Sequence, residues 1–168
     1  MTEGERVIVG VSGSVGSLAA VYRAVDEARR RDAVLVPVAA WLPAEDSLRP
    51  LSELEHAARR RLDLVFEQAF GGYPAGLLIH PQVVRAEAGR ALVAAADRPT
   101  DLLVVGESRQ GRLGVLRHGS VTRYCRSHAG CPVVVVPASE LLASLERTVA
   151  AQQQATAARC RVGLGYLD

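Results

Sequence analysis

Apolar and polar positions fall into alternating blocks along the chain, and these blocks predict strands that alternate with helices. The short blocks are almost wholly apolar and rich in β-branched residues, which is typical of strands buried on both faces of a parallel sheet. These predicted strands are residues 6–11, 33–40, 82–86, 101–106 and 131–137, of which the third is the weakest. The longer blocks have apolar residues at steps of three and four, and they predict helices over residues 17–31, 51–69, 89–97 and 119–129. This alternation predicts an α/β domain with a doubly wound parallel sheet and right-handed crossovers.

Local signals mark where the first two predicted helices begin and end. The first helix has one apolar stripe, made by Ala20, Val21, Ala24, Val25 and Ala28. Ser17 is its expected N-cap, and the run 29–31 of three arginines suits the negative end of the helix dipole. Gly71 and Gly72 are expected to end the second helix.

The pattern changes after Pro137. Residues 139–158 predict a further helix, with Leu142, Leu145 and Val149 on one face, and the last residues have no clear pattern. We therefore expect one domain over residues 1–138, followed by a C-terminal extension over 139–168 that is partly helical or disordered.

Length and composition exclude several classes of protein. A chain of 168 residues, of which 49% are hydrophobic, can bury the core of one domain. It has no run of 18 apolar residues, and its start lacks the pattern of a secretory signal, so we expect a cytoplasmic protein without a membrane span. Cys125, Cys131 and Cys160 form no CxxC pair and have no metal-ligand spacing with histidine, so no metal site is expected.

The charge pattern points to an anion rather than to nucleic acid. All 20 basic residues are arginine, and the formal net charge is only +2. Residues 108–139 contain five arginines and no acidic residue. This segment is either a solvated basic face or part of an anion site. The sequence has no helix-turn-helix pattern, and only 4% of its residues are aromatic, which argues against nucleic acid as a partner.

Two loops are expected to meet at one edge of the sheet. In an open parallel sheet, ligands bind beyond the carboxyl ends of the strands. One loop follows the first strand at residues 10–14, and the other begins at Gly106 and ends at Gly119 and Ser120, where a helix starts. Glycine allows close approach of the backbone, and the free N–H groups of a helix start favour an anion. The sequence therefore predicts a phosphate-binding loop between Gly106 and Ser120.

These residues carry a family resemblance. The stretches 104–106, 119–123 and 128–133, with Gly10, Gly13 and Ser14 in the front half, resemble the universal stress protein family, actinobacterial members in particular. The resemblance covers residues 6–137. It implies a Rossmann-like fold of the adenine nucleotide alpha hydrolase type, with five parallel strands in the order 3-2-1-4-5. It also implies a stress-linked protein that binds ATP or AMP, with Mg²⁺ only beside ATP, and at most slow ATP hydrolysis.

The nucleotide motif of that family is only partly present. ATP-binding members have glycine, two residues, glycine, nine residues, and then glycine with serine or threonine. Gly106 and the Gly119–Ser120 pair match, but Arg109 takes the place of the middle glycine. Ser12 takes the place of the aspartate that contacts ribose in nucleotide-binding members. Arg109 either points its guanidinium at the phosphates or fills the space that they would occupy.

The resemblance also implies which residues would form the site. The candidate nucleotide-binding residues are Gly10, Val11, Ser12, Val38, Gly106, Arg109, Gly119, Ser120 and Val121, with Val38 lining the adenine pocket. No catalytic residue is assigned.

Two alternatives to nucleotide binding stay open. The chain could be an interaction protein with a vestigial pocket. In that case the apolar edge strand Val133, Val134, Val135 and Val136 would form a homodimer by antiparallel pairing, as the resemblance suggests. The other alternative is an ATP pyrophosphatase-type enzyme, because residues 12–17 faintly resemble the Ser-Gly-Gly-x-Asp-Ser loop of that class. Against it, Ser14 replaces a glycine and Gly16 replaces the aspartate.

Overall fold

The computed structural model describes residues 4–45, 47–107 and 120–163, except for the side chains of residues 120 and 155–163. Its sheet has five strands, all paired in parallel, in the order β3-β2-β1-β4-β5. The strands are β1 Arg6–Gly10, β2 Val34–Trp41, β3 Gln82–Arg85, β4 Leu102–Gly106 and β5 Val133–Val136. The predicted fold class and strand order are confirmed.

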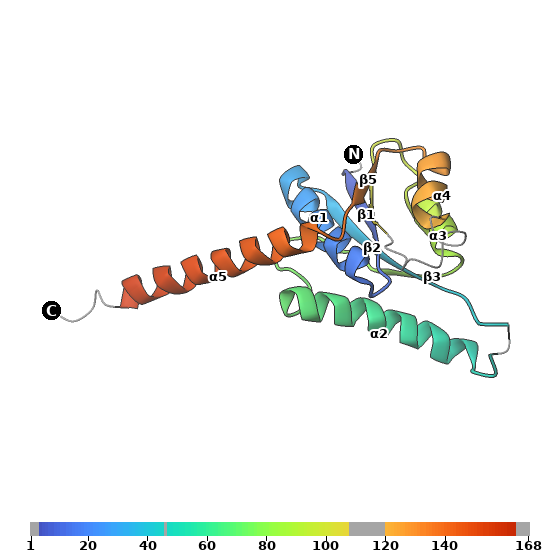
Figure 1. Ribbon diagram of the computed structural model, residues 1–168, viewed down its shortest axis with the longest axis horizontal. Helices are drawn as coiled ribbons and strands as arrows, with labels where there is room; N and C mark the ends of the chain where they lie inside the picture. The colour runs from blue at the N-terminus through green and yellow to red at the C-terminus, as the bar shows by residue number, and fades with distance from the viewer. Residues whose placement is uncertain (1–3, 46, 108–119, 164–168) are drawn as a thin grey trace.

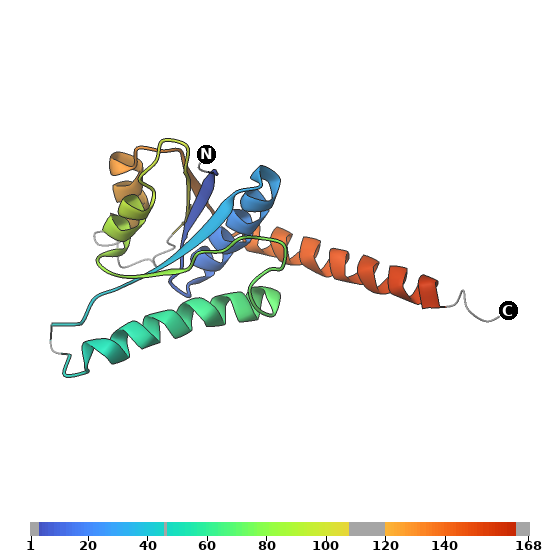
Figure 2. The ribbon, with the colours of Figure 1, turned by 180° about the vertical axis from the view of Figure 1, so that it is seen from behind.

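Helices cover both faces of this sheet (Figures 1 and 2). They are α1 Val15–Arg31, α2 Leu51–Phe70, α3 Ala88–Ala95, α4 Ser120–His128 and α5 Glu140–Gly163. The α1, α2 and α5 helices lie on one side of the sheet, and α3 and α4 lie on the other. Strand residues alternate between two cores: Val7 and Val9 pack with α1 and α2, whereas Ile8 packs with α3 and α4. The result is a three-layer domain.

The predicted stripe of α1 is confirmed, but its N-cap is Ser14, three residues earlier than expected. All five stripe residues are buried in the first core. The helix begins at Val15, and the Ser14 side chain accepts a hydrogen bond from the backbone N–H of Ser17. Ser17 is therefore a buried first-turn residue rather than the cap. The next helix, α2, ends as predicted at Gly71, which has φ 73° and donates its N–H to the Glu67 carbonyl.

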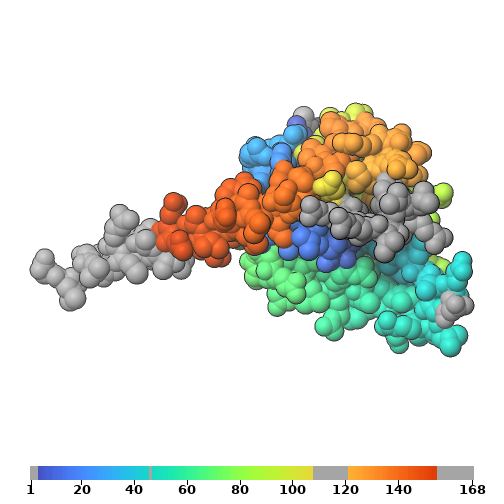
Figure 3. Space-filling view, in the orientation of Figure 1, coloured from blue at the N-terminus to red at the C-terminus, as the bar shows by residue number. Residues whose placement is uncertain are grey.

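The C-terminal helix α5 begins against α1 and then extends away from the domain (Figure 3). The side that faces the domain carries Leu141, which packs on the first core, and Ser144, which is 5% exposed. The predicted face of Leu142, Leu145 and Val149 is real, but these side chains are 68%, 38% and 51% exposed. The α5 helix thus contacts the domain through Leu141 and through the ion pairs Glu140–Arg23 and Arg147–Asp26. Within the residues that the structure describes, no helix is both long and apolar enough to span a membrane.

Candidate functional site

A small cavity lies at the carboxyl ends of β1, β2 and β4, where the sequence predicts a ligand. Its volume is about 140 Å³. Six of the candidate residues line it together: Gly10, Val11, Ser12, Val38, Gly106 and Val121. Arg109 and Gly119 lie outside the described residues. Ser120 begins α4, but its side chain is also outside the description.

The cavity has lining residues that sequence reasoning missed. They are Ser14, Ser17, Ala40, Ala88, Leu92, Val105 and Glu107. Ala40 could have been found, because it follows Val38 by two positions on the same face of β2. Ala88 and Leu92 come from α3, and no local sequence signal indicates how that helix crosses the strand ends.

The turn between β1 and α1 is fixed by a chain of serine hydrogen bonds. The backbone N–H of Ser12 donates to the Ser17 hydroxyl at 2.9 Å, and that hydroxyl donates to the Gly10 carbonyl at 3.1 Å. The Ser14 hydroxyl caps α1 and also lies 3.1 Å from the Ser12 hydroxyl. Gly13 has φ 79°, which favours glycine. The turn therefore holds two exposed hydroxyl groups, those of Ser12 and Ser14, at the rim of the cavity.

Gly106 has a packing role that is independent of any ligand. A Cβ atom at Gly106 would overlap the carbonyl group of Gly16, and a Cβ atom at Gly16 would overlap the carbonyl oxygen of Glu107. The end of β4 and the first turn of α1 thus touch backbone to backbone. Gly106 is the first glycine of the nucleotide motif, and this contact requires glycine there whether or not a nucleotide binds.

The inner walls of the cavity are apolar. Val38 and Leu92 are 2% and 3% exposed, and Val11 donates its N–H to the Val38 carbonyl at 2.9 Å. A Cβ atom at Gly10 would lie 3.1 Å from Leu92 Cδ1, so glycine gives Leu92 the room to close the floor. The volume is well below the roughly 300–1,000 Å³ of pockets for drug-sized ligands. The described cavity is therefore suited to one ring system, with the rest of a ligand lying at the rim.

The charge around the cavity does not favour a phosphate group. Glu107 lines the rim with an exposed carboxylate, and its backbone N–H donates to the Val136 carbonyl at 2.8 Å. Among the described lining residues there is no arginine or histidine. A phosphate at this cavity would need its cationic partners from residues 108–119, which are not described. The Ser12, Ser14 and Glu107 side chains are instead suited to hydrogen bonds with sugar hydroxyl groups.

Metal and cysteine chemistry receive no support from the described part of the chain. It contains no group of three or more histidine, cysteine, aspartate or glutamate residues placed to hold a metal ion. Burial raises the pKa of the Cys125 thiol to about 11, so it stays protonated at neutral pH. Cys125 is a core residue.

Comparisons with known proteins agree with this architecture. Residues 4–137 match the model of the universal stress protein family. One solved universal stress protein, determined in complex with cAMP, is 27% identical and aligns over 80% of this chain and 97% of its own, with a TM-score of 0.50. The UspA protein of Lactobacillus plantarum is 20% identical over 81% of this chain and 99% of its own, with a TM-score of 0.54. A universal stress protein from Burkholderia pseudomallei is 24% identical over 79% and 95%, with a TM-score of 0.56.

Among curated protein sequences, none matches the chain significantly. The family model nevertheless spans the whole sheet and the helices α1 to α4. The solved relatives share the same fold over nearly their full length. The chain belongs to the universal stress protein family.

Proposed function

We propose that this chain is a stress-response regulatory module that binds an adenine nucleotide at the cavity beyond β1, β2 and β4. One observation carries the proposal. Six of the residues that were predicted from the sequence together form part of the wall of one cavity at the strand ends. The 27% identical relative that was solved with cAMP supports the same class of ligand. A universal stress protein from Arabidopsis thaliana was solved with AMP bound, although at 16% identity it bears only on the fold.

The adenine ring would lie in the apolar slot between Val38, Leu92 and Val121. Burial of a flat ring against such walls is favourable, and the cavity volume matches one ring system. Ribose would then lie at the rim. There Ser12, whose hydroxyl can still donate or accept one hydrogen bond, replaces the aspartate of nucleotide-binding relatives, and Glu107 would supply the carboxylate acceptor. A carboxylate at Glu107 would thus take over the role of the aspartate in ribose binding.

The phosphates are expected to contribute less than in relatives with a full glycine motif. The described lining offers them no cation and one carboxylate. Their contacts would come from Arg109, Gly119 and Ser120, which belong to the segment whose motif is altered. We therefore expect adenosine, AMP and cAMP to bind with similar affinity, with Mg²⁺ needed only beside ATP. The proposed role is binding rather than catalysis.

Calorimetric titration of the full chain with adenosine, AMP and ATP tests this proposal. An Ala88→Phe variant should abolish binding. Ala88 is the exposed first residue of α3 and lines the cavity, so the phenylalanine ring would fill the space that the ligand needs. Ala94→Phe is the matched control, since Ala94 is exposed on the same helix and does not line the cavity. The absence of heat with all three ligands at millimolar concentration would reject nucleotide binding.

A second role, as a dimeric interaction module, is favoured by the exposure of the sheet edge. The β5 strand is the last in the sheet, and Val133, Val134 and Val135 are only partly buried. We propose that β5 pairs with β5 of a second copy across a two-fold axis. Val135→Asp should then convert a dimer to a monomer in sedimentation velocity. A wild-type monomer at micromolar concentration would contradict this role. We also propose that the chain is divided into a domain over residues 1–138 and an extension over residues 139–168.

A further inference from the structure

A second hollow, distinct from the cavity at the strand ends, lies between α1 and α5 and is lined almost wholly by arginine. It has a volume of about 480 Å³. Its lining residues are Arg23, Asp26, Arg29 and Arg30 of α1, and Arg147 of α5. Four guanidinium groups thus surround one carboxylate. We call this hollow the arginine cleft.

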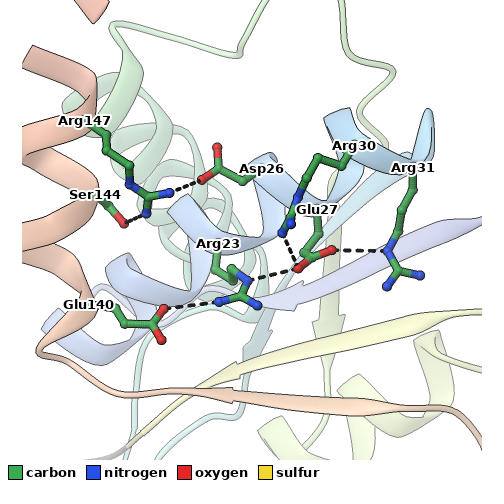
Figure 4. Close-up of polar contacts among 8 residues, drawn as sticks. All are labelled: Arg23, Asp26, Glu27, Arg30, Arg31, Glu140, Ser144 and Arg147. Atoms are coloured by element: carbon green, nitrogen blue, oxygen red, sulfur yellow. Dashed lines mark hydrogen bonds and ion pairs between the residues drawn. The ribbon is translucent and has the colours of Figure 1, made fainter. Parts of the chain in front are cut away.

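Two arginines of the cleft, Arg23 and Arg30, are held in place by carboxylates that leave most of their donors unused (Figure 4). Glu27 is 8% exposed and accepts from Arg23 at 3.0 Å and from Arg30 at 2.6 Å. Arg23 also lies 3.5 Å from Glu140 at the start of α5. Each guanidinium has five N–H donors, and these contacts engage one or two of them. These contacts therefore fix the positions of Arg23 and Arg30, while donors remain for a ligand.

Arg147 connects the cleft to the C-terminal helix. Its guanidinium donates to the Ser144 hydroxyl at 3.1 Å and lies 3.4 Å from an Asp26 carboxylate oxygen (Figure 4). The distance to Asp26 is long for an ion pair, and both side chains are substantially exposed. Such an exposed pair contributes little stability and is open to competition from another anion.

Arg29 supplies a cation that has no counterion in the described part of the chain. It lines the arginine cleft and also the neighbouring hollow between α1, the end of α2 and α5. Among the described residues its side chain makes no hydrogen bond or ion pair, although its backbone carbonyl accepts from the N–H of Asp32. Arginines in the last turn of a helix interact favourably with the helix dipole, and this explains the run 29–31 in part. It does not explain why Arg23, two turns earlier, and Arg147 of another helix converge on the same hollow.

From this convergence we propose that the arginine cleft binds a small phosphate-bearing polyanion that bridges α1 and α5. One guanidinium group can donate two parallel hydrogen bonds to the oxygens of a phosphate group, and several arginines can bind the same phosphate chain. The volume lies within the range of small-molecule pockets, about 300–1,000 Å³, and so favours a small ligand over a flat nucleic-acid surface. Asp26 would oppose the ligand, and its partner Arg147 would turn from Asp26 to the phosphate.

This site is independent of the cavity at the strand ends. Ser14 and Ser17, in the first turn of α1, line that cavity, whereas Arg29 and Arg30 are in the last turn. At 1.5 Å per residue, Ser17 and Arg30 are separated by about 20 Å along the helix axis. The proposal does not rest on nucleotide binding.

Calorimetric titration of the full chain with sodium tripolyphosphate at low salt tests the proposal, because this probe carries no base or sugar. We expect one binding site in the wild type. Arg29→Gln should weaken binding about tenfold, since it removes a charge-assisted contact with the ligand and breaks no side-chain hydrogen bond or ion pair among the described residues. Arg126→Gln is the matched control: Arg126 is also an exposed arginine in the last turn of a helix, α4, and its loss should leave the affinity unchanged.

Asp26→Asn gives the sharper result, because it removes a negative charge from the cleft. It should raise the affinity for tripolyphosphate about threefold, in the range of an exposed charge interaction. A site elsewhere on the protein would not respond in this way. ATP and adenosine form two further arms of the experiment. In the Ala88→Phe variant, binding of tripolyphosphate should persist while binding of adenosine is lost.

Three outcomes would overturn the proposal. The first is that no stoichiometric binding of tripolyphosphate is seen in the wild type. The second is equal weakening by Arg29→Gln and Arg126→Gln, which would indicate attraction to overall charge. The third is binding of duplex DNA in the absence of tripolyphosphate binding, which would make the cleft part of a nucleic-acid surface.

Discussion

The cavity at the strand ends and the arginine cleft are lined by different kinds of group. The cavity beyond β1, β2 and β4 is formed by backbone, glycines and apolar side chains, and its one described charge is the Glu107 carboxylate. The arginine cleft is formed by charged side chains, and one of them, Arg147, lies beyond the residues that match the family model. The first hollow follows from the family fold, whereas the second requires the helix that follows it. The cavity at the strand ends is thus formed within the family domain, whereas the arginine cleft also needs a residue from the C-terminal helix α5.

The backbone contact under the first cavity is the place where a single change should have the largest effect. Gly106→Ala would place a methyl group against the Gly16 carbonyl, and neither backbone segment can move freely. We expect a loss of about 3 kcal/mol in the free energy of unfolding, measured by urea denaturation. Gly130→Ala is the control, because nothing lies within 4 Å of a Cβ atom there. Equal effects of the two variants would contradict the packing role of Gly106.

The charged network beneath the arginine cleft should respond to Glu27→Gln. Burial acts to raise the pKa of Glu27, but the hydrogen bonds from Arg23 and Arg31 outweigh it, so the pKa lies below its usual value. Loss of this carboxylate leaves three arginines of α1 without their shared partner. We expect a destabilisation of about 2 kcal/mol at pH 7, measured by urea denaturation.

The stability that Glu27 contributes should depend on pH, and the same variant tests this. A carboxyl group with a lowered pKa contributes stability above its unfolded value, here near 4.5, and the contribution is lost as the pH falls through the folded value. The difference in the free energy of unfolding between wild type and Glu27→Gln should therefore become smaller as the pH falls from about 5 to about 3, the range in which a glutamate carboxyl group usually titrates. A gap that stays constant over this interval would show that the carboxylate charge is not what stabilises α1.

Salt should separate the two hollows. Binding of tripolyphosphate to the arginine cleft depends on exposed charges, so raising ionic strength from about 0.01 M to 0.15 M should weaken it about tenfold. Binding of adenosine to the apolar cavity should change little over the same range. Calorimetry of both ligands at each salt concentration measures the contrast. A similar salt dependence for the two ligands would remove the distinction between the sites.

The smallest expected effect is at the rim of the first cavity. Glu107→Gln keeps the shape of the side chain but weakens its hydrogen bond to a ribose hydroxyl, so the affinity for adenosine should fall about threefold. Free adenine, which has no ribose, should bind both proteins equally. If adenine binding fell as well, Glu107 would be shaping the cavity rather than binding the sugar.

Most of the fold could be predicted because the strands and helices of this chain have unambiguous patterns. Strands that are apolar throughout, such as β4, indicate burial on both faces, and the stripe of α1 has a helical period. The N-cap was placed at Ser17 instead of Ser14 because several serines compete in one turn, and only the backbone conformation decides which of them caps the helix.

Parts of the candidate site could not be predicted, since they depend on how elements pack. Glu107 follows a strand whose end could be predicted, but nothing in the sequence indicates that this residue lines the cavity. The glycine at position 106 was assigned to a ligand, whereas its contact with Gly16 is visible only in three dimensions. For α5, the periodic apolar face of Leu142 and Val149 predicts a buried side, yet the helix lies on α1 through Leu141 and Ser144 instead.

One helix, α1, carries both hollows, and this has a thermodynamic consequence. Its first turn borders the apolar cavity and its last turn borders the arginine cleft, so each hollow exists only while α1 is packed on the sheet. A ligand that binds either end selects the folded chain and shifts the unfolding equilibrium by mass action. The melting temperature of the whole domain would thus report the concentrations of two chemically unrelated ligands.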